Sequence, residues 1–463
     1  MKKDVTSKYV RPSREEKIFY EVCVIFLLAL FVIPQYFGIP FPMFDFTLLR
    51  IMIIAVLLMV IADSEKKKSL VNIIMNKRYS YVLIPYLIVL LYTMVLRADI
   101  NALLNPLLEL VGFYLCIYII KDIIGIEKSI KYIIIFCYIL TISGVIEYVL
   151  GRSPFSYLET IGGIYTGAFV RSGNYRIMGP CNHSLGYGLL LISIAPIVCI
   201  DMENREINVL KRPILFGLFA MNIFLTGSRS TLAVFIIEII LLFLFSSKIN
   251  KKKCILFLFV FVVALAVFLV VFHSTGIAQY ILLQITSLVD EVFDTDFAVA
   301  YGASKQALDS SSNYREQLKY IFTLDWLNPV LGIGRKRAFS AEINGSFIKS
   351  VDDFYIAEYI RYSYTGLIAY VVFIMYFVIN ILKKCFKEKS GIIRAVLIGA
   401  VCYLINLKWV DSLQTLKYLY ILFALYAVIY DEEETLKDRK VGQAGRGRYE
   451  RIAVKAVKSK YIK

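Results

Sequence analysis

The sequence has 463 residues, of which 59% are hydrophobic and 19% are charged, and its formal net charge is +16. Soluble domains are about 45–50% apolar and about 25% charged, so this composition excludes an ordinary water-facing fold. The positive charge lies in short runs between long apolar stretches, as in cytoplasmic loops that face anionic lipid, which argues against a nucleic-acid partner. We therefore expect an integral membrane protein.

Twelve apolar segments, most of them close to the bilayer-spanning length of about 17–25 residues, follow one another along the chain. They lie near residues 19–37, 45–62, 80–96, 103–120, 132–150, 183–200, 213–226, 231–247, 254–273, 357–382, 391–407 and 416–430. The gaps between them are alternately rich in Lys and Arg and nearly free of both, which predicts cytoplasmic termini. The predicted fold class is an all-α polytopic membrane protein with about 12 transmembrane helices.

Two of the segments predicted to face outward, 151–181 and 274–353, are far longer than the usual connection of about 4–6 residues. The Leu and Ile content of the second predicts short helices that form a small extracytoplasmic cap, and long ordered loops are usually functional. The predicted organisation is helices one to nine with the first outward loop in 1–273, the large loop in 274–353, helices ten to twelve in 354–430, and a basic cytoplasmic tail in 431–463.

Four arginines, the first of them Arg171, stand out because they lie at outward membrane boundaries, where the charge rule disfavours them. Arg176 precedes the sixth segment, Arg229 lies in the tight turn after the seventh, and Arg315 lies in the large loop. Ser228 and Ser230 add hydroxyl groups beside Arg229. Converging guanidinium groups would suit a phosphate or pyrophosphate, although any single arginine could instead be ion-paired or reach to the interface.

Other polar residues at these boundaries allow two interpretations each. His183 begins the sixth segment close to Arg176, either as a substrate contact or as an interfacial residue. Asp352 and Asp353 precede the tenth segment; spacing favours a helix cap, and a general base is the alternative. Glu147 is a weaker candidate. The sequence lacks a P-loop and a dinucleotide-binding motif, and we expect no metal site and no cofactor.

The arrangement resembles the O-antigen polymerase and ligase superfamily of bacterial envelope enzymes, in particular Wzy-type polysaccharide polymerases. The resemblance rests on Arg176 with Gly179, on the Gly-Ser-Arg-Ser turn at 227–230, and on the large loop after the ninth segment. In that loop Arg315 is followed by Asn328-Pro329 and Gly332-Ile333-Gly334, and Thr365-Gly366-Leu367-Ile368 follows in the next helix.

The resemblance implies a metal-independent, inverting glycosyltransferase in the bacterial cytoplasmic membrane, with its active site on the extracytoplasmic face. Its donor would be an undecaprenyl-pyrophosphate-linked glycan, with the departing pyrophosphate held by Arg176, Arg229 and Arg315. Repeat units would be joined into a capsular or O-antigen-type polysaccharide, and flippase and chain-length regulator proteins are implied as partners. Ligases of the family usually have a His where this chain has Asp352-Asp353, which favours a polymerase. A ligase and a twelve-helix transporter of envelope precursors are the alternatives.

Overall fold

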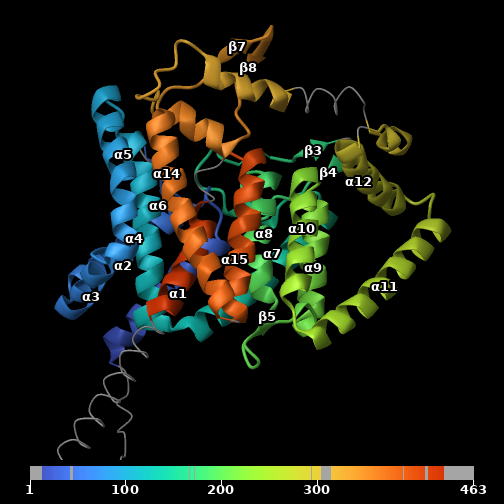
Figure 1. The fold of residues 1–463 in the computed structure, drawn as a ribbon, viewed down its shortest axis with the longest axis horizontal. Helices are drawn as coiled ribbons and strands as arrows, with labels where there is room; N and C mark the ends of the chain where they lie inside the picture. The colour runs from blue at the N-terminus through green and yellow to red at the C-terminus, as the bar shows by residue number, and fades with distance from the viewer. Residues whose placement is uncertain are drawn as a thin grey trace, which may run out of the picture.

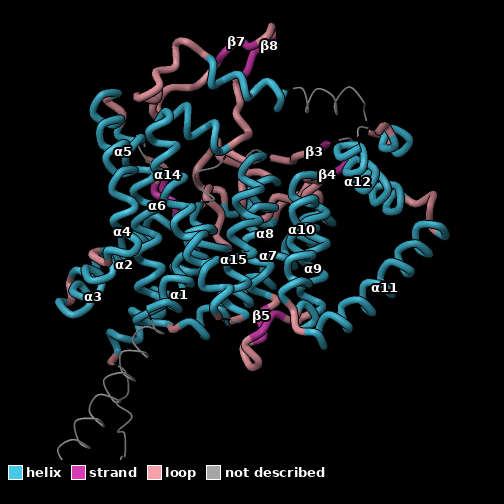
Figure 2. The backbone as a smooth tube through the Cα atoms, viewed as in Figure 1, coloured by secondary structure: helices cyan, strands magenta, loops and turns pink. Residues whose placement is uncertain are grey.

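The computed structural model describes residues 13–41, 45–165, 167–171, 173–293, 295–303, 314–388, 390–411 and 416–431. Helices dominate these residues, and their strands form four short antiparallel ribbons (Figure 2). The predicted cytoplasmic tail 431–463 lies, apart from Asp431, outside the described residues. A mostly helical membrane fold is therefore confirmed in outline.

The α-helices are α1 Arg14–Phe31, α2 Leu48–Ile61, α3 Ser64–Ile74, α4 Lys77–Ser80, α5 Ile84–Arg97, α6 Ile100–Tyr118, α7 Ile126–Leu150, α8 Ser184–Val198, α9 Pro213–Leu225, α10 Arg229–Phe245, α11 Lys248–Val271, α12 Gly276–Phe293, α14 Phe354–Lys387 and α15 Gly391–Asn406. A final helix covers residues 416–431. Shorter helical segments are η1 Tyr81–Leu83, η2 Ile119–Ile124, η3 Pro154–Leu158, η4 Val209–Lys211, η5 Phe297–Tyr301, η6 Lys319–Thr323 and η7 Leu407–Trp409.

The four ribbons connect helices and contain no more than three residues in any strand. They pair β1 Gly38–Ile39 with β2 Phe46–Thr47, β3 Val170–Arg171 with β4 Asn174–Tyr175, β5 Ile200–Asp201 with β6 Glu206–Ile207, and β7 Ala341–Ile343 with β8 Ser346–Ile348.

Helix is present at each of the twelve predicted apolar segments. Six helical stretches in the described residues are long and apolar enough to cross a membrane, and α2, α8 and α9 are shorter apolar helices. Backbone groups in lipid must be paired within the segment itself, which is why these apolar sequences form helices. The count of twelve membrane spans stays a prediction.

The centre of the bundle is α8, which is buried along its whole length and packs most extensively against α15. Small residues allow this close approach. A Cβ at Gly399 of α15 would lie 2.6 Å from the Ser193 carbonyl oxygen, and one at Gly188 would lie 2.7 Å from Thr231 Cγ2. Without a hydrophobic force between helices in lipid, such close backbone contact is a main source of packing energy.

The described parts of the large loop 274–353, which include α12, lie at one end of the bundle together with β3 and β4 (Figure 1). We call this end the loop face. Its described part contains α12, η5, η6 and the hairpin β7–β8, so it is not purely helical as predicted. A small hydrophobic cluster ties the loop to α14: Leu318, Ile321, Leu327 and Ile333 pack with Tyr359 and Ile360.

Helix α14 is broken at Ser363, whose φ is 64° and ψ is −170°. The break frees carbonyl groups in the preceding turn, and the large loop supplies their partners. The Ile333 N–H donates to the Ile360 oxygen at 2.9 Å, and the Gly334 N–H donates to the Arg361 oxygen at 3.0 Å. Only glycine fits at position 332, because a Cβ there would lie 2.1 Å from the Arg361 oxygen. Irregular backbone inside a membrane protein is stable only when its polar groups are paired in this way.

Helix α11 differs from the others because nearly all of its apolar surface is exposed, and it runs away from the bundle toward α12 (Figure 1). Asn250, near the start of α11, is the residue of this helix that is buried, and its side-chain amide donates to Glu206 Oε1 at 2.8 Å. Helix α12 then returns to the bundle and contacts α10, which brings the start of the large loop to the turn that contains Arg229.

Candidate functional site

The turn between α9 and α10 contains the Gly-Ser-Arg-Ser motif. Ser228 caps α10, and its Oγ accepts hydrogen bonds from the Thr231 N–H at 3.3 Å and from the Thr231 hydroxyl at 2.8 Å. Ser230 lies 3.2 Å from the same oxygen. The main role of Ser228 is therefore to cap helix α10, because its hydroxyl pairs with an N–H group at the helix start that has no partner within the helix.

Arg176 is buried against this turn. Its Nε donates to the Thr226 carbonyl oxygen at 2.6 Å, and its guanidinium carbon lies 4.9 Å from the centre of the Phe169 ring. Gly227 makes room for the side chain with a φ of +59°, and a Cβ there would lie 3.1 Å from Arg176 Cγ. The structure thus brings Arg176 to the turn that carries Arg229.

Glu147 holds the segment that carries Arg176. Its carboxylate is buried in α7 and accepts hydrogen bonds from the Met178 N–H at 2.7 Å, the Gly179 N–H at 2.8 Å and the Tyr175 hydroxyl at 2.9 Å. These three hydrogen bonds fix residues 175–179 on α7, so Glu147 positions the arginine without touching it. The sequence marked Glu147 only as a weak candidate, because nothing in it shows that residues 175–179 fold back over α7.

Arg229 and Arg315 share one carboxylate, that of Glu291 in α12. Arg229 Nη1 lies 2.7 Å from Glu291 Oε2, and Arg315 Nη1 lies 3.9 Å from Glu291 Oε1. Arg229 is largely buried, and its Nη2 is buried without a hydrogen-bond partner in the part of the chain that the structure describes. A buried guanidinium N–H without a partner is costly, so this group invites an anionic ligand.

His183 lies beside Arg176 and precedes α8. Its Nδ1 accepts from the Leu185 N–H at 3.1 Å, and its ring packs edge-on to Phe169 at 4.6 Å. Burial, with help from the Arg176 charge and against the charge of Asp352, lowers the pKa of His183 to about 4. The imidazole is therefore neutral at physiological pH and adds no charge to the site.

The two predicted catalytic carboxylates have different surroundings. Asp353 caps α14 and accepts from the Tyr355 N–H at 2.8 Å and the Ile356 N–H at 3.1 Å, and burial raises its pKa. Asp352 accepts from the Ser350 hydroxyl at 3.1 Å, and its charge reaches His183. Asp352 is thus close enough for its charge to act on His183, whereas Asp353 is occupied in capping its own helix.

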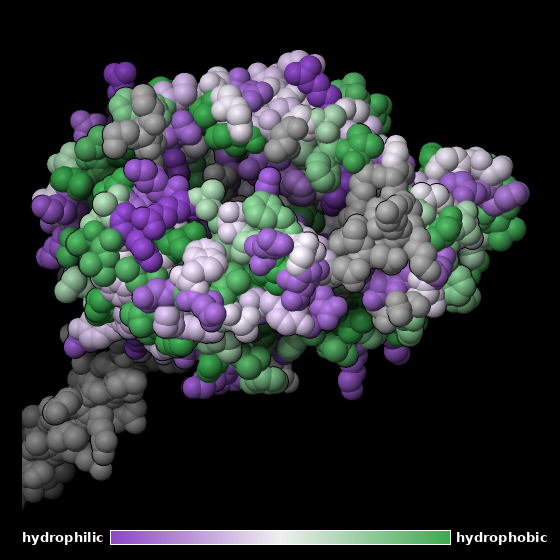
Figure 3. Space-filling view, turned by 90° about the horizontal axis from the view of Figure 1, so that it is seen from above, coloured by the Kyte–Doolittle hydropathy of each residue, from purple (hydrophilic) through white to green (hydrophobic). Residues whose placement is uncertain are grey.

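Arg176, Arg229 and Arg315 form what we call the arginine site. Arg176 and Arg229 meet at one turn, Arg315 joins them through Glu291, and His183 lies beside them with Asp352 near it. Seen from the loop face, the surface of the molecule has hydrophilic and hydrophobic residues intermixed and is hollowed near its middle (Figure 3). The convergence of these residues from five separate segments is the main feature of the site.

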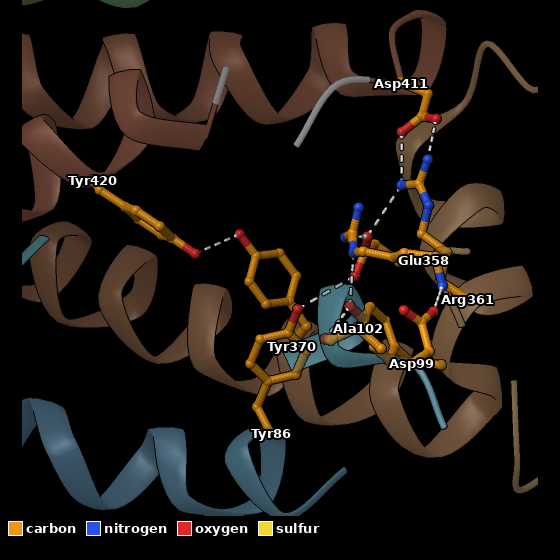
Figure 4. Close-up of polar contacts among 10 residues, drawn as sticks. Tyr86, Asp99, Ala102, Glu358, Arg361, Tyr370, Asp411 and Tyr420 are labelled. Atoms are coloured by element: carbon orange, nitrogen blue, oxygen red, sulfur yellow. Dashed lines mark hydrogen bonds and ion pairs between the residues drawn. The ribbon is translucent and has the colours of Figure 1, made fainter. Parts of the chain in front are cut away.

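A second polar network, which the sequence did not predict, joins the large loop to α14 (Figure 4). Glu358 is 1% exposed and pairs with Arg335 at 2.8 Å and Arg361 at 3.2 Å. Arg361 also pairs with Asp411 at 2.5 Å. Asp99 accepts the backbone N–H groups of residues 335 and 336, at 2.5 and 2.7 Å. These charges compensate one another, so we assign the network to holding the loop on the bundle.

Residues 214–360 match a protein family model described as O-antigen ligase. The match runs from α9 through the large loop to the start of α14 and includes Arg229, Glu291, Arg315 and Asp352. No curated protein matches the chain significantly.

The fold is thus that of a mostly helical membrane protein in which residues 214–360 are similar to the O-antigen ligase family. This match is consistent with the O-antigen polymerase and ligase superfamily that the sequence resembles. Proteins of this family act in membranes on lipid-linked glycans.

Proposed function

We propose that this protein polymerises undecaprenyl-pyrophosphate-linked oligosaccharide repeat units into a capsular or O-antigen-type polysaccharide on the extracytoplasmic face. The observation that carries this proposal is the arginine site, above all the buried Arg229 with a donor that has no partner among the described residues. A pyrophosphate needs several fixed donors at one place, and guanidinium forks fit its oxygens in pairs.

The reaction that suits this site is a displacement at the anomeric carbon of the donor sugar. The acceptor hydroxyl oxygen bonds to that carbon while the bond to the pyrophosphate oxygen breaks, and the electron pair leaves with the pyrophosphate. Negative charge grows on that oxygen in the transition state, where preorganised arginines stabilise it most. The arginines take the role that a metal ion has in other phosphate-transfer sites, and inversion follows from a single displacement.

The Glu291 carboxylate lies between Arg229 and Arg315, where pyrophosphate oxygens would lie in this reaction. In the proposed cycle the donor displaces Glu291 from the two guanidinium groups, and the carboxylate returns when the product leaves. Asp352 is the better placed of the two predicted carboxylates to receive the acceptor proton, because Asp353 is bound to backbone N–H groups.

A ligase is the second candidate, because the family model that matches residues 214–360 is described as O-antigen ligase. The two activities share the donor and differ in the acceptor. A polymerase transfers glycan to another lipid-linked repeat unit, whereas a ligase transfers it to a lipid or wall acceptor.

Deleting this protein from its source strain separates these candidates. A polymerase mutant is expected to lose long chains from the cell surface and to keep single repeat units, as measured by gel electrophoresis of extracted glycan. Full-length polymer that stays on its lipid carrier would instead show a ligase, and an unchanged glycan profile would contradict both activities. Plasmid-borne wild-type protein that restores the chain length is the control.

Gly227→Ala is expected to lower polymer formation on the order of tenfold, because small misplacements of catalytic groups are costly. A Cβ here would press on the Arg176 side chain at 3.1–3.3 Å. The left-handed conformation adds a cost of roughly 1–2 kcal/mol. Gly217→Ala in α9 is the matched control, since a Cβ there meets nothing within 4 Å. Polymer per unit of inserted protein is the readout, and equal values for the two variants would contradict the prediction.

A further inference from the structure

Two acidic residues, Asp290 and Glu291, follow each other in the last turn of α12. The C-terminal end of a helix has a partial negative charge, so carboxylates are unfavourable there unless other groups compensate them. The structure gives the two residues different surroundings, because Asp290 is 8% exposed whereas the side chain of Glu291 is 33% exposed. Each carboxylate therefore needs its own explanation.

Asp290 ties the chain that follows α12 back to the helix. Its Oδ1 accepts hydrogen bonds from the Thr295 hydroxyl at 2.6 Å and from the Phe297 N–H at 2.9 Å. Its Oδ2 accepts one from the Ala298 N–H at 2.7 Å. Because α12 also packs against α10 and η5, these bonds fix the backbone at Glu291 beside the start of α10.

Glu291 is held by arginines instead. Its carboxylate lies 2.7 Å from Arg229 Nη1 and 3.9 Å from Arg315 Nη1, and no hydrogen bond from another residue reaches it within the described part of the chain. The side chain of Arg229 is only 9% exposed. A partly exposed carboxylate regains water when it leaves, whereas a buried guanidinium group without an anion is costly. Glu291 is therefore an anion that a ligand can replace.

An anion that is part of the chain competes with every anion that arrives from solution. A group tethered next to its partner acts at an effective concentration on the order of millimolar, and it loses little entropy when it binds. A small free anion offers Arg229 little that Glu291 does not already offer. A lipid-linked pyrophosphate adds the contacts of its lipid chain and its sugar, so it can replace Glu291 where a free anion cannot. Specificity is such a difference between two affinities.

We propose that Glu291 is a specificity-determining residue, which keeps free phosphate and pyrophosphate out of the arginine site and speeds release of the lipid pyrophosphate after transfer. This inference rests on the proposed function, in which the same arginines bind the donor. It adds that the site is selective because it contains its own competing anion, whose position Asp290 fixes.

Binding measurements on the purified full-length protein in detergent, without added metal ions, test this role. The probes are inorganic pyrophosphate and undecaprenyl pyrophosphate. Glu291→Gln keeps the size of the side chain and removes its charge, and it is expected to bind inorganic pyrophosphate at least tenfold more tightly than the wild type. Undecaprenyl pyrophosphate is expected to dissociate from this variant more slowly.

Two further variants show where the effect arises. Adding Arg229→Ala to Glu291→Gln is expected to abolish the gain, because the gained affinity comes from the guanidinium group that Glu291 releases. Glu342→Gln is the matched control, since it removes an equal charge from an exposed position on β7 of the same loop. Its affinities for both probes are expected to stay within twofold of the wild type.

Wild-type affinity for inorganic pyrophosphate in Glu291→Gln, in protein with an unchanged melting temperature, would overturn the proposal. A gain that persists in the double variant would overturn it as well, because the anion would then bind elsewhere. If Glu291→Gln itself unfolds, Glu291→Asp, which withdraws the carboxylate by one methylene, decides by the same criterion. Neither result touches the proposed function, which fails separately if Arg229→Ala binds undecaprenyl pyrophosphate as well as the wild type does.

Discussion

Arg229→Ala is expected to abolish polymer formation while the protein still inserts into the membrane. Removing one preorganised donor from a site where negative charge develops costs about 100-fold or more in rate. Of the three arginines, Arg229 has contacts that indicate an anion-binding role most directly. Its Nη1 pairs with Glu291, and its Nη2 is buried without a partner among the described residues. Arg315→Ala and Arg176→Ala are expected to give the same loss. Polymer length in membranes with matched protein levels is the measurement.

Arg152→Ala is the control for these variants. Arg152 follows α7, and it donates to the Ser156 hydroxyl at 2.9 Å and stacks on Tyr157 at 4.7 Å, neither of which belongs to the arginine site. Arg229→Lys adds a finer test, because lysine keeps the charge and loses the planar fork, so activity between those of the wild type and the alanine variant is expected. Full-length polymer from all three alanine variants would refute the pyrophosphate site.

Glu358→Ala is expected to have the largest effect on stability. The substitution leaves Arg335 and Arg361 in a buried network without the carboxylate that they share, and breaking such a buried pair costs about 3–5 kcal/mol. The loop contacts at the break in α14 depend on the same residues, so we expect the large loop to become accessible to protease. The melting temperature in detergent and limited proteolysis are the measurements.

Glu316→Ala is the matched control, because Glu316 pairs with Lys319 at 2.8 Å on the exposed surface. Exposed pairs of this kind contribute little, so no measurable shift of the melting temperature is expected. A Glu358→Ala protein as stable as this control would show that the network does not hold the loop. The inference that Glu358 compensates the charges of Arg335 and Arg361 (Figure 4) would then be wrong.

The predicted site residues fall into two groups. The role of one group depends on neighbours in the sequence, and the role of the other depends on residues far away in the sequence. Asp353 is a helix cap, which the carboxylate at the start of an apolar run indicated from sequence alone. Ser228 also caps a helix, whereas the sequence suggested it only as a hydroxyl group beside Arg229. The arginines were recognised because they break the charge rule at membrane boundaries. Their meeting at one turn, and the sharing of Glu291, could not be predicted, because Glu291 lies 62 positions from Arg229 and 24 from Arg315 in the sequence.

The roles of Glu147 and Glu358 could not be predicted for the same reason. Each is a single acidic residue in an apolar helix, and the sequence does not show whether such a residue faces backbone N–H groups or a pair of arginines. Gly332 is a similar case. This position requires glycine because a Cβ would clash with the Arg361 carbonyl oxygen, which the break at Ser363 exposes.

The sequence by itself determined that the chain lies in a membrane, where its helices fall, and which arginines are out of place. These properties depend on hydropathy and charge summed over contiguous residues, which a linear sequence contains in full. Only the tertiary structure decided which side chains converge on the arginine site, which carboxylates position them, and which lock the large loop. Such contacts join residues far apart in the chain, and the energy of a buried charge depends on neighbours that folding alone brings to it.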